Sequence, residues 1–139
     1  MTKTVLAALA VMALAAPALA AGDAAKGEAE FKKCKACHAI VAPDGTEIQK
    51  GGKTGPNLYG VIGRPVAGDA GYSAYGESIK AVGAAGTVWD EASLAAYVAD
   101  PSKWLKEATG DSAAKSKMSF KLAKGGEDVA AYLASVAAQ

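Results

Sequence analysis

The stretch "CKACH" (residues 34–38) contains both cysteines and the single histidine of this 139-residue chain. Residues three apart lie on the same face of a helical turn, so Cys34 and Cys37 can present both thiols to one partner. His38 follows at once and adds an imidazole beside them. Three reactive side chains within five positions predict a site for one bound group.

A Cys-x-x-Cys pair has other uses, which the rest of the sequence disfavours. A disulfide between residues three apart closes a tiny loop and constrains little. A thioredoxin-type redox pair needs a βαβ setting, and the chain shows no such pattern. A structural zinc site needs a second ligand pair, but no further cysteine or histidine exists. Cys-x-x-Cys-His is the attachment signature of haem c. We therefore expect one haem c, bound covalently through Cys34 and Cys37, with His38 on its iron.

The sixth coordination position of that iron would need a ligand from elsewhere in the chain. Two of the three methionines lie in the N-terminal segment discussed below, which leaves Met118. A lone methionine is usually a core residue, but Met118 is the one soft side chain left for the iron. We expect His38 and Met118 as the axial pair. The alternatives are an open site, water, or a lysine such as Lys117 or Lys121.

The choice of sixth ligand separates two classes of function. A His/Met pair raises the reduction potential of haem iron, and a filled sixth position keeps oxygen and peroxide from the metal. Both effects favour an electron carrier over an enzyme. An open site would instead suit a peroxidase or a gas sensor. A metal-free thiol oxidoreductase is a third, weaker interpretation of the cysteine pair.

Residues 1–20 have the features of a secretory signal peptide. A lysine near the start is followed by an apolar stretch at 5–20 that is short for a membrane span. It ends in the small-x-small cleavage pattern Ala18-Leu19-Ala20. We expect cleavage after Ala20, or one residue later, and a single exported domain over residues 21–139, located in the periplasm. An uncleaved membrane anchor is the alternative.

The mature domain has a balanced charge with an uneven distribution. Loss of Lys3 lowers 15 basic residues to 14, which equals the 14 acidic residues. This balance excludes a strongly basic nucleic-acid surface. Clustered lysines could steer the protein toward acidic partners, although they could also be ordinary solvated side chains. The clustered residues are Lys32, Lys33, Lys35, Lys103, Lys106, Lys115, Lys117, Lys121 and Lys124.

The remaining sequence predicts one small all-α domain, with short helices and loops wrapped around one covalently bound haem. Asp23 and Asp90 are placed as N-caps, Pro101 can open a helix, and Gly83 and Gly110 can end helices. Gly, Pro, Lys and Asn dominate residues 42–71, which predict loops and turns. No segment shows sustained strand alternation. The predicted helices span residues 23–34, 75–83, 90–100, 101–110 and 126–138.

Six segments together carry a resemblance to a known family. They are "KGEAEFKKCKACH" (26–38), "KTGPNLYGVIGR" (53–64), "GYSAYGESIK" (71–80), "VWDEASLAAYVADP" (88–101), "KSKMSFKL" (115–122) and "AAYL" (130–133). In this order they resemble the class I cytochromes c, and most closely the cytochromes c2 of purple photosynthetic bacteria. The likeness runs from about Gly22 to the C-terminus.

The resemblance implies roles for further residues. The carbonyl of Pro56 would accept a hydrogen bond from His38. Three side chains would hydrogen-bond the haem propionates, and Tyr97 would lie near the Met118 sulfur. Core packing is the other interpretation of the aromatic members. The implied propionate partners are Arg64, Tyr75 and Trp89.

The resemblance also implies packing between the ends of the domain. Gly27 and Phe31 would meet Tyr132 and Leu133, with the glycine permitting close approach of two helices.

The resemblance further implies a biological role. The protein would be a monomeric one-electron carrier that takes electrons from the cytochrome bc1 complex. Its acceptor would be a photosynthetic reaction centre or an oxidase, approached through a lysine-rich face. One departure is the loop between Trp104 and Met118, which is longer than in mitochondrial cytochromes c. A longer loop predicts easier release of Met118.

Overall fold

The computed structural model describes residues 22–137. The predicted signal peptide lies outside the described residues, as does residue 21 at the predicted start of the mature domain. Within the described part, every helix is too short or too polar to cross a membrane. The elements in chain order are α1 (Ala24–Glu30), η1 (Phe31–Lys33), β1 (Ile40–Val41), β2 (Glu47–Gln49), α2 (Glu77–Ala84), α3 (Glu91–Ala99), α4 (Pro101–Thr109) and α5 (Gly126–Ala137).

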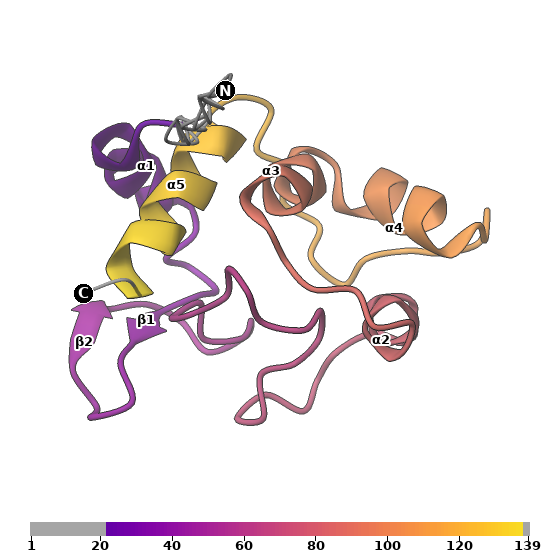
Figure 1. The fold of residues 1–139 in the computed structure, drawn as a ribbon, viewed down its shortest axis with the longest axis horizontal. Helices are drawn as coiled ribbons and strands as arrows, with labels where there is room; N and C mark the ends of the chain where they lie inside the picture. Colours follow the sequence, from indigo (N-terminus) through magenta and orange to yellow (C-terminus); the bar gives the residue numbers. More distant parts are fainter. Residues whose placement is uncertain (1–21, 138–139) are drawn as a thin grey trace, which may run out of the picture.

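The first and last helices pack against each other (Figure 1). Asp23 caps α1, as predicted, by accepting hydrogen bonds from two backbone N–H groups of the first turn. A Cβ on Gly27 would collide with the carbonyl of Asp128, so only glycine allows this approach. The rings of Phe31 and Tyr132 lie 5.9 Å apart. The predicted contact between the two ends of the domain is confirmed.

The α3–α4 corner follows the signals predicted at Asp90, Pro101 and Gly110, and Asp100 adds a cap that was not predicted. Asp90 and Ser93 form a capping box at the start of α3. Asp100 caps α4, Pro101 occupies its first position, and Gly110 ends it in the left-handed conformation with φ 69°. Leu94 and Tyr97 are buried, whereas Val98 is half-buried. Local capping chemistry therefore sets where the chain turns between the two helices.

Two local predictions were wrong. Residues 40–41 and 47–49 form an antiparallel hairpin, although the sequence predicted no strand. Strands this short cannot display alternation, but Asp44 and Gly45 at the turn were a usable signal. In addition, α2 continues through Gly83 to Ala84, and the chain turns at Gly86, where φ is 87°.

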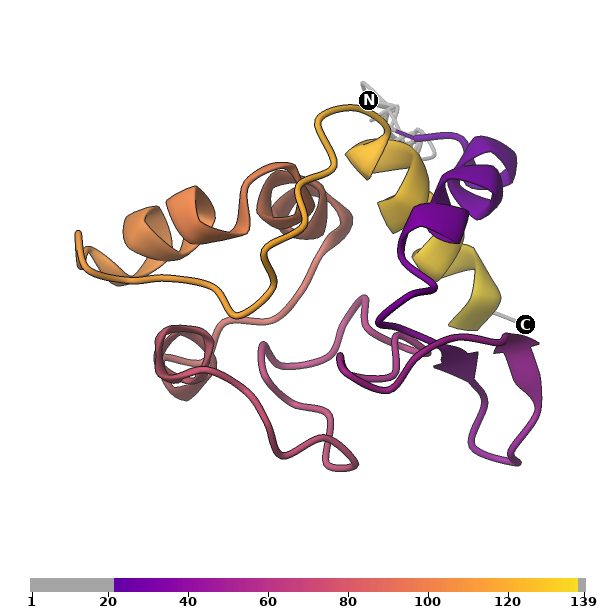
Figure 2. The ribbon, with the colours of Figure 1, turned by 180° about the vertical axis from the view of Figure 1, so that it is seen from behind.

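The helices and long loops enclose a common interior. In Figures 1 and 2, α5, α3 and α4 follow one edge of the molecule, and the loops before α2 follow the opposite edge. Figure 2 shows the segment from α4 to α5 returning beneath α4 to the middle of the molecule. This return brings Met118 among the core residues, where it packs against the buried cluster.

Candidate functional site

The nine residues selected from the sequence line one cavity of about 280 Å³. Much of the remaining lining is apolar, with Leu58, Val61, Ile79 and Leu94 among it. The structure therefore brings together residues that are up to 84 positions apart in the chain, from residue 34 to residue 118. These residues are Cys34, Cys37, His38, Pro56, Arg64, Tyr75, Trp89, Tyr97 and Met118.

His38 is held by contacts close to it in the sequence and by one short loop. Its backbone N–H donates to the carbonyl of Cys34 at 3.0 Å, which closes a helical turn. Its ring Nδ1 donates to the carbonyl of Pro56 at 2.8 Å, the bond that the resemblance implied. A Cβ on Gly55 would overlap the imidazole ring, so the glycine lets the loop lie directly against it.

The protonation of His38 suits a metal ligand. Burial lowers the pKa of the imidazole, and the hydrogen bond to Pro56 opposes this only in part. The neutral ring is therefore favoured at pH 7. Because Nδ1 carries the proton given to Pro56, Nε2 retains its lone pair. His38 can bind a metal through that nitrogen while Pro56 fixes the orientation of the ring.

The cysteine pair does not have the features of a redox dithiol. Cys34 and Cys37 are not joined by a disulfide. Burial, followed by the nearby charge of Glu30, raises the pKa of the Cys34 thiol to about 11. Reactive dithiols depend instead on a lowered thiol pKa. This electrostatic setting disfavours a thiol oxidoreductase and suits two anchoring positions on one turn.

Met118 reaches the cavity on a segment held by hydroxyl groups. The Oγ of Ser116 accepts a hydrogen bond from the backbone N–H of Met118 at 3.0 Å. The same hydroxyl is 3.2 Å from the hydroxyl of Tyr97. Tyr97 thus contacts the Met118 segment, residues 115–122, through Ser116. Ser116 was not among the residues selected from the sequence. A serine two positions before the only candidate thioether was the available signal.

Arg64 and Tyr75 are already engaged with the protein. Arg64 donates to the carbonyls of Tyr59 at 3.3 Å and Asn57 at 3.0 Å. Its Nε is buried and has no partner among the described residues. The hydroxyl of Tyr75 accepts from the backbone N–H of Asp69 at 3.2 Å, which leaves its own proton free to donate. Both residues therefore offer at least one donor to an acceptor group in the cavity.

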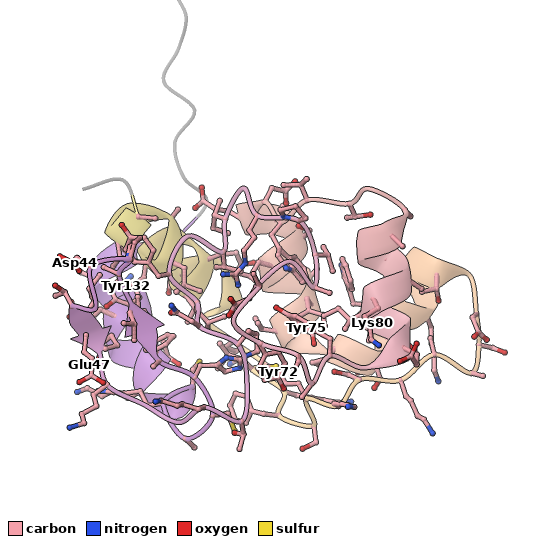
Figure 3. The ribbon with its side chains drawn as sticks, turned by 90° about the horizontal axis from the view of Figure 1, so that it is seen from below. Asp44, Glu47, Tyr72, Tyr75, Lys80 and Tyr132 are labelled. Carbon is pink, nitrogen blue, oxygen red and sulfur yellow. The ribbon has the colours of Figure 1, made fainter. Side chains whose placement is uncertain are left out.

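Aromatic rings contribute to the cavity lining and pack in two groups. Tyr72 and Tyr75 lie side by side, 4.8 Å apart and edge to face (Figure 3). Trp89 stacks on Trp104 at 5.1 Å and lies 5.2 Å from Tyr97. Trp104 was missed as a supporting residue, because no periodicity within one helix reveals a stack between different elements.

The donor set fits a haem c. Two thiols share a turn, a neutral imidazole follows them, a thioether lines the same cavity, and the surroundings are largely apolar. The buried, unpartnered Nε of Arg64 suits a negatively charged substituent on such a group. No feature of the cavity requires a different cofactor.

Comparisons with known proteins give a consistent set of relatives. Cytochrome c2 of Rhodobacter capsulatus is 64% identical over 111 residues, which are 80% of this chain and 80% of that protein. Cytochrome c-550 of Paracoccus pantotrophus is 62% identical over 111 residues, covering 78% of this chain and 82% of that protein. The solved structure of the Rhodobacter capsulatus cytochrome c2 matches with a TM-score of 0.81 and 63% identity, and covers 83% of this chain and 98% of that chain. No protein-family model matches the chain.

Proposed function

Because the chain belongs to the cytochrome c2 family of class I c-type cytochromes, we propose that it is a periplasmic one-electron carrier with His38 and Met118 as axial ligands. The predicted class I fold is confirmed by the solved relatives. The protein carries one haem c through Cys34 and Cys37, and the relatives are electron carriers rather than enzymes.

One observation supports the proposed ligation above the others: His38 and Met118 line the same apolar cavity as the two anchoring thiols. When bound there, haem c supplies an iron that alternates between the ferrous and ferric states. The chain's contribution is to hold both ligands in place. Pro56 fixes the imidazole of His38, and Ser116 holds the backbone of Met118. A largely apolar lining keeps water from the metal.

The other selected residues have roles at the haem propionates or beside the methionine ligand. Arg64, Tyr75 and Trp89 bind the propionates, with Arg64 supplying the positive charge. Tyr97 acts on the methionine side through Ser116. The support for this assignment is that Arg64 and Tyr75 each keep at least one free donor after their bonds to the protein.

The proposed partners are those that the resemblance to the cytochromes c2 implies. The donor is the cytochrome bc1 complex, and the acceptor is a photosynthetic reaction centre or a terminal oxidase. Lys115 and Lys117 line the cavity and are exposed, so they are placed to meet an acidic partner. Other lysines of the cluster are paired with acids: Lys33 with Glu30, Lys103 with Glu107, and Lys121 with Asp100.

Docking through lysines makes electron transfer sensitive to salt. The second-order rate of oxidation by an acidic partner is expected to fall steeply as ionic strength rises, because salt screens charges beyond about 8 Å at 0.15 M. Stopped-flow oxidation over a series of salt concentrations measures this. A flat salt profile would contradict the lysine-rich docking face.

The visible spectrum of two variants tests the ligation. The oxidised wild-type holoprotein is expected to be low-spin, with the weak red band of methionine on ferric iron. Met118→Leu keeps the side-chain volume and removes the sulfur, and Met118→Ala removes both. Both should lose the red band. If Met118 only fills the core, the leucine variant keeps the wild-type spectrum. A high-spin wild-type spectrum would favour the alternative of an open-site peroxidase or gas sensor.

A further inference from the structure

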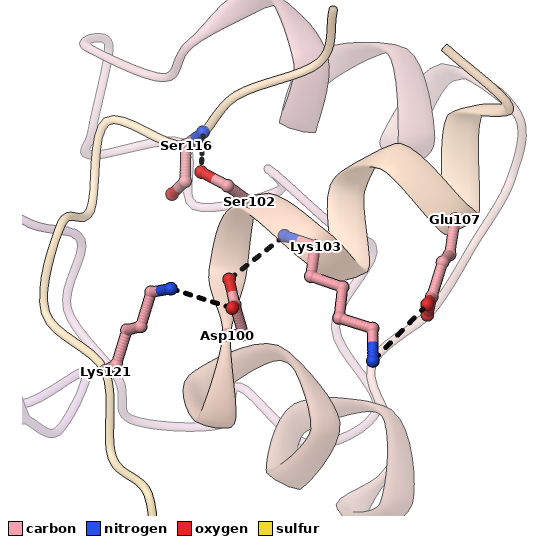
Figure 4. Close-up of polar contacts among 6 residues, drawn as sticks. All are labelled: Asp100, Ser102, Lys103, Glu107, Ser116 and Lys121. Carbon is pink, nitrogen blue, oxygen red and sulfur yellow. Dashed lines mark hydrogen bonds and ion pairs between the residues drawn. The ribbon is translucent and has the colours of Figure 1, made fainter. Parts of the chain in front are cut away.

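The α3–α4 corner, residues Val98–Ser102, holds the Met118 segment on both sides of the methionine. The backbone N–H of Ser116 donates to the Oγ of Ser102 at 3.0 Å. After the methionine, the Nζ of Lys121 donates to Asp100 at 2.8 Å. Figure 4 shows both bonds at the start of α4, one at Ser102 and one at the capping residue Asp100. The backbone N–H of Leu122 also donates to the carbonyl of Val98 at 2.8 Å.

At the start of α4, the hydroxyl of Ser102 and one carboxylate oxygen of Asp100 are not used in capping the helix, so both can hold the Met118 segment. Pro101 has no N–H, and one oxygen of Asp100 caps the helix through the N–H of Lys103 at 3.1 Å. The other oxygen remains for Lys121. The side chain of Lys103 turns to Glu107 instead, with 3.9 Å between the charged atoms (Figure 4). Because Asp100 caps the helix, the hydroxyl of Ser102 is available to the Met118 segment.

The holding contacts differ in strength. The bond from Ser116 to Ser102 is partly buried, so water replaces a lost partner poorly. The pair between Lys121 and Asp100 is exposed, and exposed ion pairs contribute little. The bond from Lys115 to Ser78, at 3.2 Å, is also exposed. Among these three side-chain contacts, the bond at Ser102 is therefore the one whose loss should most weaken the hold on the Met118 segment.

The long loop between α4 and Met118 is held by local contacts. The side chain of Asp111 accepts from the backbone N–H of Ala113 at 2.8 Å, which closes a turn just after α4. Ala114 is buried, with 3% of its surface exposed. The extra residues therefore lead from one anchored turn to Ser116. This residue bonds to Ser102 and lies two positions before the methionine.

We propose that Ser102 is a positioning residue for Met118: by holding Ser116, it keeps the thioether in the cavity and excludes external ligands from the sixth position of the iron. This inference rests on the proposed ligation by Met118. It counters the expectation that the long loop releases the methionine easily. An external ligand binds only the fraction of molecules in which Met118 has moved away, so its apparent affinity reports that fraction.

Imidazole binding to the oxidised holoprotein tests the proposal. Ser102→Ala removes the acceptor for Ser116 and should raise the apparent imidazole affinity about fivefold, the effect expected for one lost hydrogen bond. Amide exchange at Ser116 should quicken in the same variant. Ser102→Thr keeps a hydroxyl and should restore the wild-type affinity. Ser135→Ala is the matched control, because among the described residues Ser135 bonds only within its own helix, to the carbonyl of Tyr132.

The Met118→Leu background separates a positioning effect from a general one. If Ser102 acts through Met118, adding Ser102→Ala to Met118→Leu should leave imidazole affinity unchanged. An equal rise in imidazole affinity in both backgrounds, or a rise of the same size in Ser135→Ala, would overturn the positioning role of Ser102. So would an unchanged affinity in Ser102→Ala when the wild type shows the red methionine band, and the proposed ligation would then stand. A wild type without that band would overturn the ligation and this inference together.

Discussion

The two segments that supply the candidate ligands are held in different ways. His38 closes a turn on Cys34, four positions earlier, and meets Pro56 in a short loop against Gly55. Met118 is reached after a long loop, and its neighbours bond to helices distant in the chain. The first ligand is therefore fixed by steric contact and local bonds, whereas the second depends on a few hydrogen bonds. Substitutions at the first segment should affect stability, and those at the second should mainly affect ligand access.

The largest effect is expected at Gly55. A methyl group there would overlap the imidazole of His38 and push it from Pro56. Gly55→Ala should lower the free energy of unfolding of the holoprotein by about 2–3 kcal/mol, near the upper end for overpacking. Guanidinium unfolding measures this.

Gly71 provides the control for that substitution. A Cβ at Gly71 would meet only the carboxylate of Asp69, at an ordinary 3.4 Å. Gly71→Ala should therefore leave the free energy of unfolding nearly unchanged. If Gly55→Ala is equally harmless, the close contact between the loop and His38 is not a constraint, and the contrast between the two segments fails.

A smaller effect is expected at Trp104 on the methionine side. This ring stacks on Trp89 and meets Tyr97 edge to face at 5.5 Å. Trp104→Leu should lower the free energy of unfolding by about 1–2 kcal/mol, because two aromatic contacts are lost. Trp104→Phe should recover part of this loss. A decrease larger than that of Gly55→Ala, measured by the same unfolding experiment, would reverse the order of the two segments.

The smallest effect is expected at Asp100 and depends on pH. The bond from Lys121, and next the N–H of Lys103, lower the pKa of this carboxyl below its ordinary value of 3.8. A lowered folded-state pKa means that the carboxylate stabilises the fold above pH 3.8, and that this contribution is lost as pH falls through the folded-state pKa. Asp100→Asn should therefore lower the thermal midpoint slightly at pH 7.

The difference between wild type and Asp100→Asn should vanish in acid. Thermal unfolding from pH 7 down to pH 2 checks this, and added salt at pH 7 should shrink the difference as well. A gap that persists at pH 2 would mean that the asparagine changes the cap of α4 and not the charge pair with Lys121.

Local rules predicted most of the helices because their signals lie within a few residues. Asp23, Asp90 and Pro101 each mark a helix start at the position the structure shows. Those rules failed at the hairpin, whose strands have two and three residues, and at Gly83, which lies inside α2. Gly83 packs against the backbone of Val66, so its small size serves tertiary contact and not helix termination.

The candidate site also combines features that local sequence reveals with contacts that only the folded chain shows. The sequence by itself determined the thiol pair, the imidazole beside it and the one available thioether, because each is fixed by residue type and by spacing or elimination. Only the tertiary structure decided that Arg64 would bind two backbone carbonyls, that Trp104 would stack on Trp89, and that Ser102 would hold Ser116. The contacts of Trp104 and Ser102 join separate segments of the chain, so their geometry depends on how those segments pack. The bonds of Arg64 depend on the path of the irregular loop that contains it, which residue type and spacing do not reveal.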